Sequence, residues 1–72
     1  MNRQKEAIQC FDQVIALNAN YTNAYNNKGN ALQSLNKFNE AIKCYNTAIE
    51  IDPEYADAYY NKVSNISEKN FI

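Results

Sequence analysis

Asparagine is the side chain with the most recognisable binding chemistry in this sequence, and it supplies about one residue in six. Its amide carries both hydrogen-bond donors and an acceptor, so it can pair with one peptide unit of an extended chain. Asn27 and Asn61 stand 34 residues apart, and a lysine follows each of them. We therefore treat this pair as candidate contacts for a peptide backbone. The alternative is that both belong to an ordinary solvated helix face.

Catalytic chemistry finds no support in the residue types. The 72 residues include no His, and Gly29 is the only glycine, so no glycine-rich phosphate loop exists. No Ser or Cys has a base at a recognisable spacing, and two cysteines without His are too few for a zinc cluster. The acidic residues are scattered over the predicted helix ends and turns. We predict that the chain is not an enzyme and holds no catalytic site, no cofactor and no metal.

Charge and hydropathy exclude two further classes of partner. Seven basic and eight acidic residues give a net charge of −1, and no basic stripe exists to follow a phosphate backbone. No apolar run approaches the roughly 18–20 residues that span a bilayer. Residues 1–6 lack the apolar core of a signal peptide. We therefore expect no nucleic-acid partner, no membrane insertion, and an intracellular, cytoplasmic location.

The sequence repeats itself with a period of 34 residues. When it is shifted by that distance, 12 of the 38 aligned pairs are identical. The identical pairs include Glu6-Ala7-Ile8 with Glu40-Ala41-Ile42, Cys10 with Cys44, Ile15 with Ile49, Tyr21 with Tyr55, Ala24-Tyr25 with Ala58-Tyr59, and Asn27-Lys28 with Asn61-Lys62. Such a period indicates stacked supersecondary units that bury a continuous core between neighbours.

The central copy resembles the tetratricopeptide repeat family. Seven residues of the fitting type stand at the signature positions of that family: Tyr25, Gly29, Leu32, Ala41, Tyr45, Ala48 and Pro53. The resemblance implies an all-α fold of antiparallel helix-turn-helix repeats stacked into an α-solenoid. Three residues depart from the pattern in the flanking copies, where Val14 replaces a small residue, Ala19 the proline and Val63 the glycine.

The pattern also predicts where the helices of the central copy begin and end. Apolar residues at helical spacing predict helix A over residues 22–35 and helix B over residues 38–51. Gly29 costs roughly 1 kcal/mol relative to alanine inside a helix, so we expect it to allow close approach of the two helices beside Ala41. Asn36 and Lys37 would form the tight turn between them. Pro53 would end helix B, since the residue before a proline avoids the helical region.

The helix order follows from aligning the flanking copies. We expect a single segment in which residues 1–21 hold helix B of a partial repeat, residues 22–55 a complete repeat, and residues 56–72 helix A and the start of the next. In this reading Asn70, Phe71 and Ile72 begin a new helix. The order B-A-B-A leaves half-repeats at both ends, so we expect a fragment of a longer superhelix or a chain that associates with itself.

The resemblance also implies a binding surface, because the A helices of such stacks line the concave side. The helix A residues not needed for packing are Asn23, Asn26, Asn27, Asn30, Gln33, Asp57, Tyr60, Asn61 and Ser64. The shared position of Asn27 and Asn61 resembles the asparagine ladder in the superhelix of O-linked N-acetylglucosamine transferases. A clamp for a C-terminal carboxylate would need basic residues on this face, and these positions hold none.

We therefore predict a protein–protein interaction module that binds a peptide or protein segment on its concave helix A face. The alternative is a structural module that self-associates through its exposed repeat ends. A third reading is the non-catalytic arm of an enzyme such as a glycosyltransferase. Cys10, Cys44, Tyr21 and Tyr55 are interpreted as packing residues, and Tyr60 as an aromatic anchor for the partner.

Overall fold

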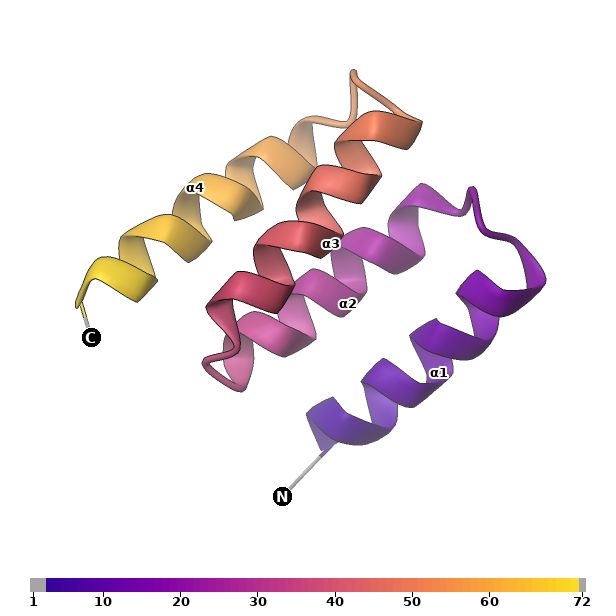
Figure 1. Ribbon diagram of the computed structural model, residues 1–72, viewed down its shortest axis with the longest axis horizontal. Coiled ribbons are helices and arrows are strands. Elements are labelled where there is room, and N and C mark those ends of the chain that lie inside the picture. The colour runs from indigo at the N-terminus through magenta and orange to yellow at the C-terminus, as the bar shows by residue number, and fades with distance from the viewer. Residues whose placement is uncertain (1–2, 72) are drawn as a thin grey trace.

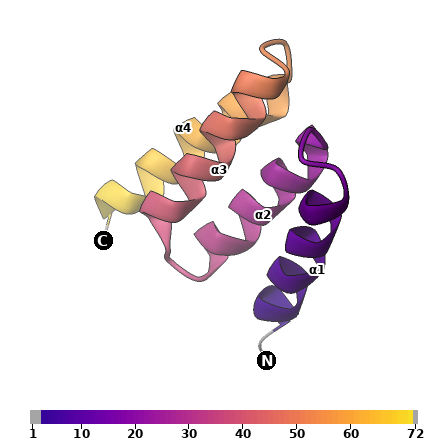
Figure 2. The same cartoon turned by 45° about the vertical axis from the view of Figure 1, so that its right-hand side comes forward.

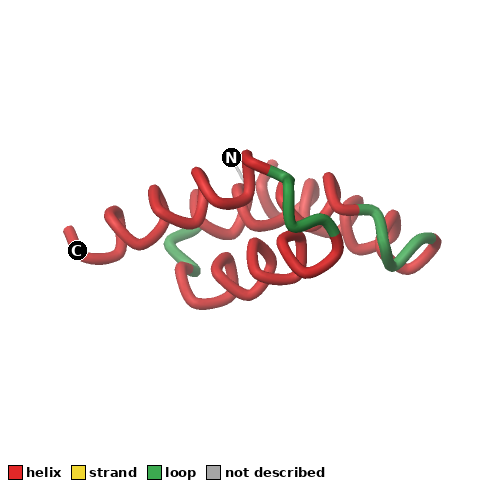
Figure 3. Tube along the Cα trace, turned by 90° about the horizontal axis from the view of Figure 1, so that it is seen from above, coloured by secondary structure: helices red, strands yellow, loops and turns green. Residues whose placement is uncertain are grey.

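The computed structural model describes residues 3–71, and this part of the chain is helical with short connecting loops and no strand (Figures 1 and 3). The helices are α1 (Arg3–Leu17), α2 (Thr22–Ser34), α3 (Phe38–Ile51) and α4 (Ala56–Phe71). The predicted helix B of the central repeat coincides with α3, and the predicted helix A ends one residue beyond α2. The prediction of an all-α fold of helical hairpins is confirmed.

The turn between α2 and α3 depends on Asn36. Its φ of 62° lies in the left-handed region, which asparagine tolerates better than most residues. The Lys37 amide then donates a hydrogen bond to the carbonyl of Leu32 at 2.9 Å. This closes the end of α2 and reverses the chain over residues 35–37, one residue more than the predicted turn of Asn36 and Lys37.

The loop after α3 is set by Asp52 and Pro53. Asp52 adopts extended backbone geometry, with φ −137° and ψ 93°, as the residue before a proline prefers. Its carboxylate accepts a hydrogen bond from the Glu54 amide at 3.1 Å. The loop after α1 lacks the proline but uses the same device, because the side chain of Asn18 accepts a hydrogen bond from the Asn20 amide at 3.1 Å. The Asx turn is thus common to both loops, with and without the proline.

The helices stack in chain order. Helix α2 lies between α1 and α3 (Figure 2). Helix α3 also packs on α4, and α2 is in direct contact with α4. The stack is a thin slab, with extents of 35 × 32 × 15 Å. Helices α2 and α4, which are the predicted A helices, lie beside each other. Helices α1 and α4 lie at opposite ends of the stack (Figure 1).

The core is centred on the ring of Tyr45, which is fully buried with Leu32, Ala41 and Cys44. A β-carbon added to Gly29 would lie 2.5 Å from Cε1 of Tyr45 and 2.8 Å from its Cδ1. The glycine therefore admits the aromatic ring against the backbone of α2. The expected close approach is confirmed, and its partner is Tyr45.

The C-terminal end differs from the prediction. Asn70 and Phe71 do not begin a new helix, because α4 continues without a break to Phe71. Glu68 and Lys69 are good helix formers, and the Nζ of Lys69 donates a hydrogen bond to Oδ1 of Asn39 at 2.7 Å. These features keep the last turn of α4 helical and attached to α3. Ile72 lies outside the described residues.

Two predicted packing roles are also wrong. Cys44 is buried, as predicted, and burial raises the pKa of its thiol. Its repeat equivalent Cys10 is exposed, because no described helix covers that side of α1, and both thiols are free. Tyr55 is half-buried, in line with a packing role, whereas Tyr21 is 48% exposed. Two residues at equivalent positions of the repeat can therefore differ in burial.

Candidate protein-interaction surface

The candidate surface consists of the predicted residues on α2 and α4, which the direct contact between these two helices brings together. We call this set the A-helix surface. Its members differ in exposure: Asn23, Asn30, Asp57 and Tyr60 are exposed; Asn27, Gln33, Asn61 and Ser64 are half-buried; and Asn26 is buried. The set is therefore part solvent-facing surface and part contact between repeats.

Asn26 and Asn61 form the polar contact that joins the two A helices. The Nδ2 of Asn61 donates a hydrogen bond to the Oδ1 of Asn26 at 3.0 Å. Asn26 is only 4% exposed, so its amide is buried between the two helices and is not available to a partner. Asn61 keeps its carbonyl oxygen and a second N–H. The contact thus fixes the side chain of one half of the candidate asparagine pair.

Asn23 orients Asn27, the other member of the candidate asparagine pair. Its Oδ1 accepts a hydrogen bond from Nδ2 of Asn27 at 3.1 Å and another from the hydroxyl of Tyr55 at 3.2 Å. Burial, and then the negative charge of Asp57, raises the pKa of Tyr55, so this phenol stays protonated and able to donate at neutral pH. Asn27 therefore also has a fixed orientation, with its carbonyl oxygen and one N–H left over.

The C-terminal half of α2 is hydrogen-bonded to the core. The hydroxyl of Tyr45 lies 2.8 Å from Oδ1 of Asn30 and 2.9 Å from Oε1 of Gln33, and its one proton can serve either acceptor. Burial raises the pKa of Tyr45 to about 12. This link between core and surface was not predicted. The sequence did contain a signal for it, because Tyr45 stands where the preceding repeat has Phe11. A buried tyrosine hydroxyl requires a hydrogen-bond partner, which a phenylalanine does not.

The α4 part of the surface has fewer internal contacts. Among the described residues, the side chains of Asp57, Tyr60 and Ser64 form no hydrogen bond. Tyr60 is 75% exposed, which is unusual for an aromatic side chain of its size. It offers an exposed aromatic face and a hydroxyl on α4.

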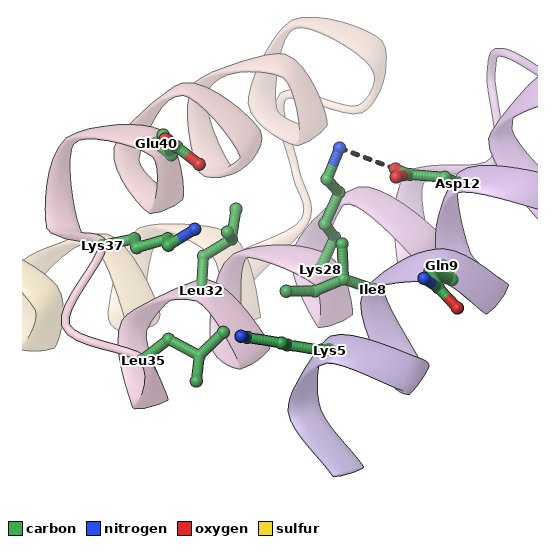
Figure 4. Close-up of a pocket in the computed structure, with 9 residues that line it drawn as sticks. All are labelled: Lys5, Ile8, Gln9, Asp12, Lys28, Leu32, Leu35, Lys37 and Glu40. Atoms are coloured by element: carbon green, nitrogen blue, oxygen red, sulfur yellow. Dashed lines mark ion pairs between the residues drawn. The ribbon is translucent and has the colours of Figure 1, made fainter. Parts of the chain in front are cut away.

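A pocket of about 380 Å³ lies elsewhere, between α1, α2 and the start of α3 (Figure 4). Apolar residues form part of its wall, and lysines and carboxylates surround them: Lys5, Ile8, Gln9, Asp12, Lys28, Leu32, Leu35, Lys37 and Glu40 line it. The Nζ of Lys28 lies 2.7 Å from Oδ1 of Asp12, and this hydrogen bond raises the pKa of Lys28. Sequence reasoning missed the pocket. The signal was Lys28, a charge where the repeat pattern has leucine.

Residues 3–71 contain no group of three or more His, Cys, Asp or Glu side chains that could hold a metal ion. Within the same range, no helix combines the length and the apolar character that crossing a bilayer requires.

Comparison with known families agrees with the geometry. Residues 22–55 match the family described as tetratricopeptide repeat, and residues 1–36 match a second description, TPR repeat. No curated protein matches the chain significantly. The second match spans half of the chain, the two together span residues 1–55, and the four helices stack as successive helix-turn-helix units. The chain belongs to the tetratricopeptide repeat family.

Proposed function

We propose that this chain binds an extended segment of another protein along the A-helix surface. Repeats of this family generally mediate protein–protein interaction, and such domains are typically non-catalytic scaffolds. The observation that carries the proposal is the paired fixation of Asn27 and Asn61. Each amide is oriented by one internal hydrogen bond on adjacent A helices, and each retains a carbonyl oxygen and an N–H.

Fixed side chains favour binding because less rotamer freedom is lost when a partner arrives. Asn27 is anchored to Asn23, and Asn61 is anchored to the buried Asn26. An extended peptide that pairs one backbone unit with each amide is held without regard to its side chains. Tyr60 then supplies a contact that depends on the side chains of the bound peptide, because exposed aromatic residues are common anchors of interfaces.

The charge of the surface selects the part of the partner that binds. The nine residues of the predicted set contain one carboxylate, Asp57, and no lysine or arginine. A partner's terminal carboxylate would meet no opposite charge there. We therefore propose an internal, neutral or basic segment as the occupant.

Replacing both Asn27 and Asn61 with alanine is expected to weaken binding of such a segment by about tenfold or more. Each amide contributes hydrogen bonds worth about 0.5–1.5 kcal/mol, and about 1.4 kcal/mol corresponds to a factor of ten. The probe is a peptide selected from a random library displayed on phage, with its affinity measured by calorimetry. An affinity unchanged in the double variant would refute the asparagine contacts.

The matched control replaces Asn20 and Asn46 with alanine, since Asn20 lies in the loop before α2, Asn46 lies on α3, and both are outside the A-helix surface. This control should leave the affinity unchanged. The Asn61 substitution also deprives the buried Asn26 of its donor, so helicity and melting temperature must be compared with those of the unmodified chain. The single Asn27→Ala variant avoids this complication, because it loses only an exposed contact with Asn23.

A second function, self-association, is supported by a different observation. Large apolar side chains are exposed on the outer helices of the stack: Leu17 on α1, and Tyr59, Val63 and Ile66 on α4. Apolar side chains gathered along one helix are typical of a surface that meets another protein. We propose that isolated copies of this chain associate through these outer helices.

A further inference from the structure

The outward side of α4 carries an uncharged stripe. Its residues recur at alternating spacings of three and four, which places them on one face of a helix, and all of them are exposed: Ala56, Tyr59, Val63, Ile66 and Asn70. Lys62 and Lys69 run along one flank of this stripe. Neither lysine forms an ion pair with a described residue, although Lys69 donates a hydrogen bond to the neutral amide of Asn39.

A second stripe with the same spacing lies on α1. It consists of Ala7, Cys10, Val14 and Leu17, of which Cys10 and Leu17 are exposed and the other two half-buried. Leu17 is 89% exposed. The corresponding flank holds Glu6 and Gln13, each directly before a stripe residue as Lys62 and Lys69 are on α4. The four residues of this stripe therefore have the same 3-4-3 spacing as Ala56, Tyr59, Val63 and Ile66 on α4.

We propose that α1 of a second copy docks antiparallel on α4, pairing the two stripes. This inference rests on the self-association proposed above and names the surfaces that carry it. Helices α2 and α3 provide the precedent, because they are an A helix and a B helix that pack as an antiparallel pair in the same molecule. Helix α4 is likewise an A helix, and α1 is a B helix.

Charge supports this partner over a second α4. When two helices face each other antiparallel, the same flank of each one meets. An antiparallel pair of α4 helices would place Lys62 and Lys69 against the same lysines of the other copy. Docking α1 instead places Glu6 opposite Lys69, and Gln13 opposite Lys62, so that one pair is attractive and the other is not repulsive.

Steric fit sets the register of the docked helix. In the α2–α3 pair, Gly29 admits the ring of Tyr45, and even a β-carbon there would lie 2.5 Å from the ring. The repeat equivalents on α4 and α1 are Val63 and Phe11. Valine leaves no room for an aromatic ring at that position. The docked α1 therefore turns Cys10, the smaller residue next to Phe11, toward Val63. The remaining layers then pair Ala7 with Ile66, Val14 with Tyr59, and Leu17 with Ala56.

The geometry has a consequence for assembly. Helices α1 and α4 lie at opposite ends of the stack (Figure 1), so one copy cannot offer both stripes to a single partner. The interface is heterologous, and such interfaces continue into rings or open filaments. The unmodified chain should therefore grow beyond a dimer as its concentration rises.

Sedimentation equilibrium of two variants tests the proposal. Leu17→Glu places a charge in the α1 stripe, and Val63→Glu places one in the α4 stripe. Both positions are exposed, so circular dichroism should show unchanged helicity. Each variant alone should associate at least about tenfold more weakly than the unmodified chain. An equimolar mixture should form dimers and nothing larger, since each variant keeps the stripe that the other has lost.

The outcomes separate the two proposals. An unmodified chain that stays a single chain at every concentration overturns both self-association and this docking mode. Association that persists in Leu17→Glu alone overturns the docking mode only, because α1 would then not take part. A charge exchange gives an independent arm: Glu6→Lys or Lys69→Glu alone should weaken association by up to about fivefold, and the two together in one chain should restore it. Failure of the double variant to recover also overturns the register.

Discussion

Replacing Tyr45 with alanine should remove most of the stability of this chain. The ring is fully buried at the centre of the core, and truncating a buried aromatic residue costs about 3–5 kcal/mol. A folded chain of this size is stabilised by only about 4–11 kcal/mol, at roughly 0.05–0.15 kcal/mol per residue. Urea unfolding followed by circular dichroism measures the loss, and its midpoint should fall steeply.

The Tyr45→Phe variant is the control that separates the ring from its hydroxyl. It keeps the packing against Gly29 and loses only the hydroxyl proton that is donated to Asn30 or Gln33. That loss should cost about 1 kcal/mol. If Tyr45→Ala were no more destabilised than Tyr45→Phe, the ring could not be the centre of the core.

Replacing Gly29 with alanine should destabilise the chain by about 1–2 kcal/mol, against its helix propensity. In an exposed helix interior this substitution gains about 1 kcal/mol. Here the new methyl group would lie 2.5–2.9 Å from three atoms of the Tyr45 ring. The ring is enclosed and its hydroxyl is held at α2, so it cannot retreat, and overpacking of this kind costs about 1–3 kcal/mol. The same urea titration measures the difference.

A second substitution decides whether the ring is the cause. In a Tyr45→Leu background the atoms that would clash are gone, so adding Gly29→Ala should become neutral or stabilising. The coupling free energy between the two sites is then the difference between the stability change that Gly29→Ala causes in the unmodified chain and the change that it causes in the Tyr45→Leu background. A Gly29→Ala change that stabilised the unmodified chain would show that α2 and α3 do not approach as closely as the structure describes.

The helices were predictable because local signals and the repeat agree. Asn36 tolerates the left-handed conformation that the turn needs, and Pro53 stops α3, so the ends of the central helices fall within one residue of the expectation. The close contact at Gly29 was also readable, since a glycine inside a helix requires a compensating reason. The identity of the contacting side chain was not readable, because several residues of α3 share that face.

The candidate surface was less predictable, because burial depends on neighbours. Asn26 and Asn61 look like solvated polar residues in the sequence, yet the stacking of α2 on α4 joins their amides and buries one of them. Asn65 lies fully buried on α4, where its Nδ2 donates to the carbonyl of Phe38 at 3.0 Å. Cys10 shows the reverse, since its equivalent Cys44 is covered and it is not. A sequence gives the face of a helix, whereas the packing of other helices decides what covers that face.

Amide-correlation NMR during titration with the selected peptide tests the proposed binding surface most directly. We expect the side-chain amide signals of Asn27 and Asn61 to shift, together with backbone signals of Tyr60 and its neighbours on α4. Signals from Lys5 and Glu40, which line the separate pocket, should stay in place. Shifts confined to that pocket, with the amides of Asn27 and Asn61 unmoved, would contradict binding along the A-helix surface.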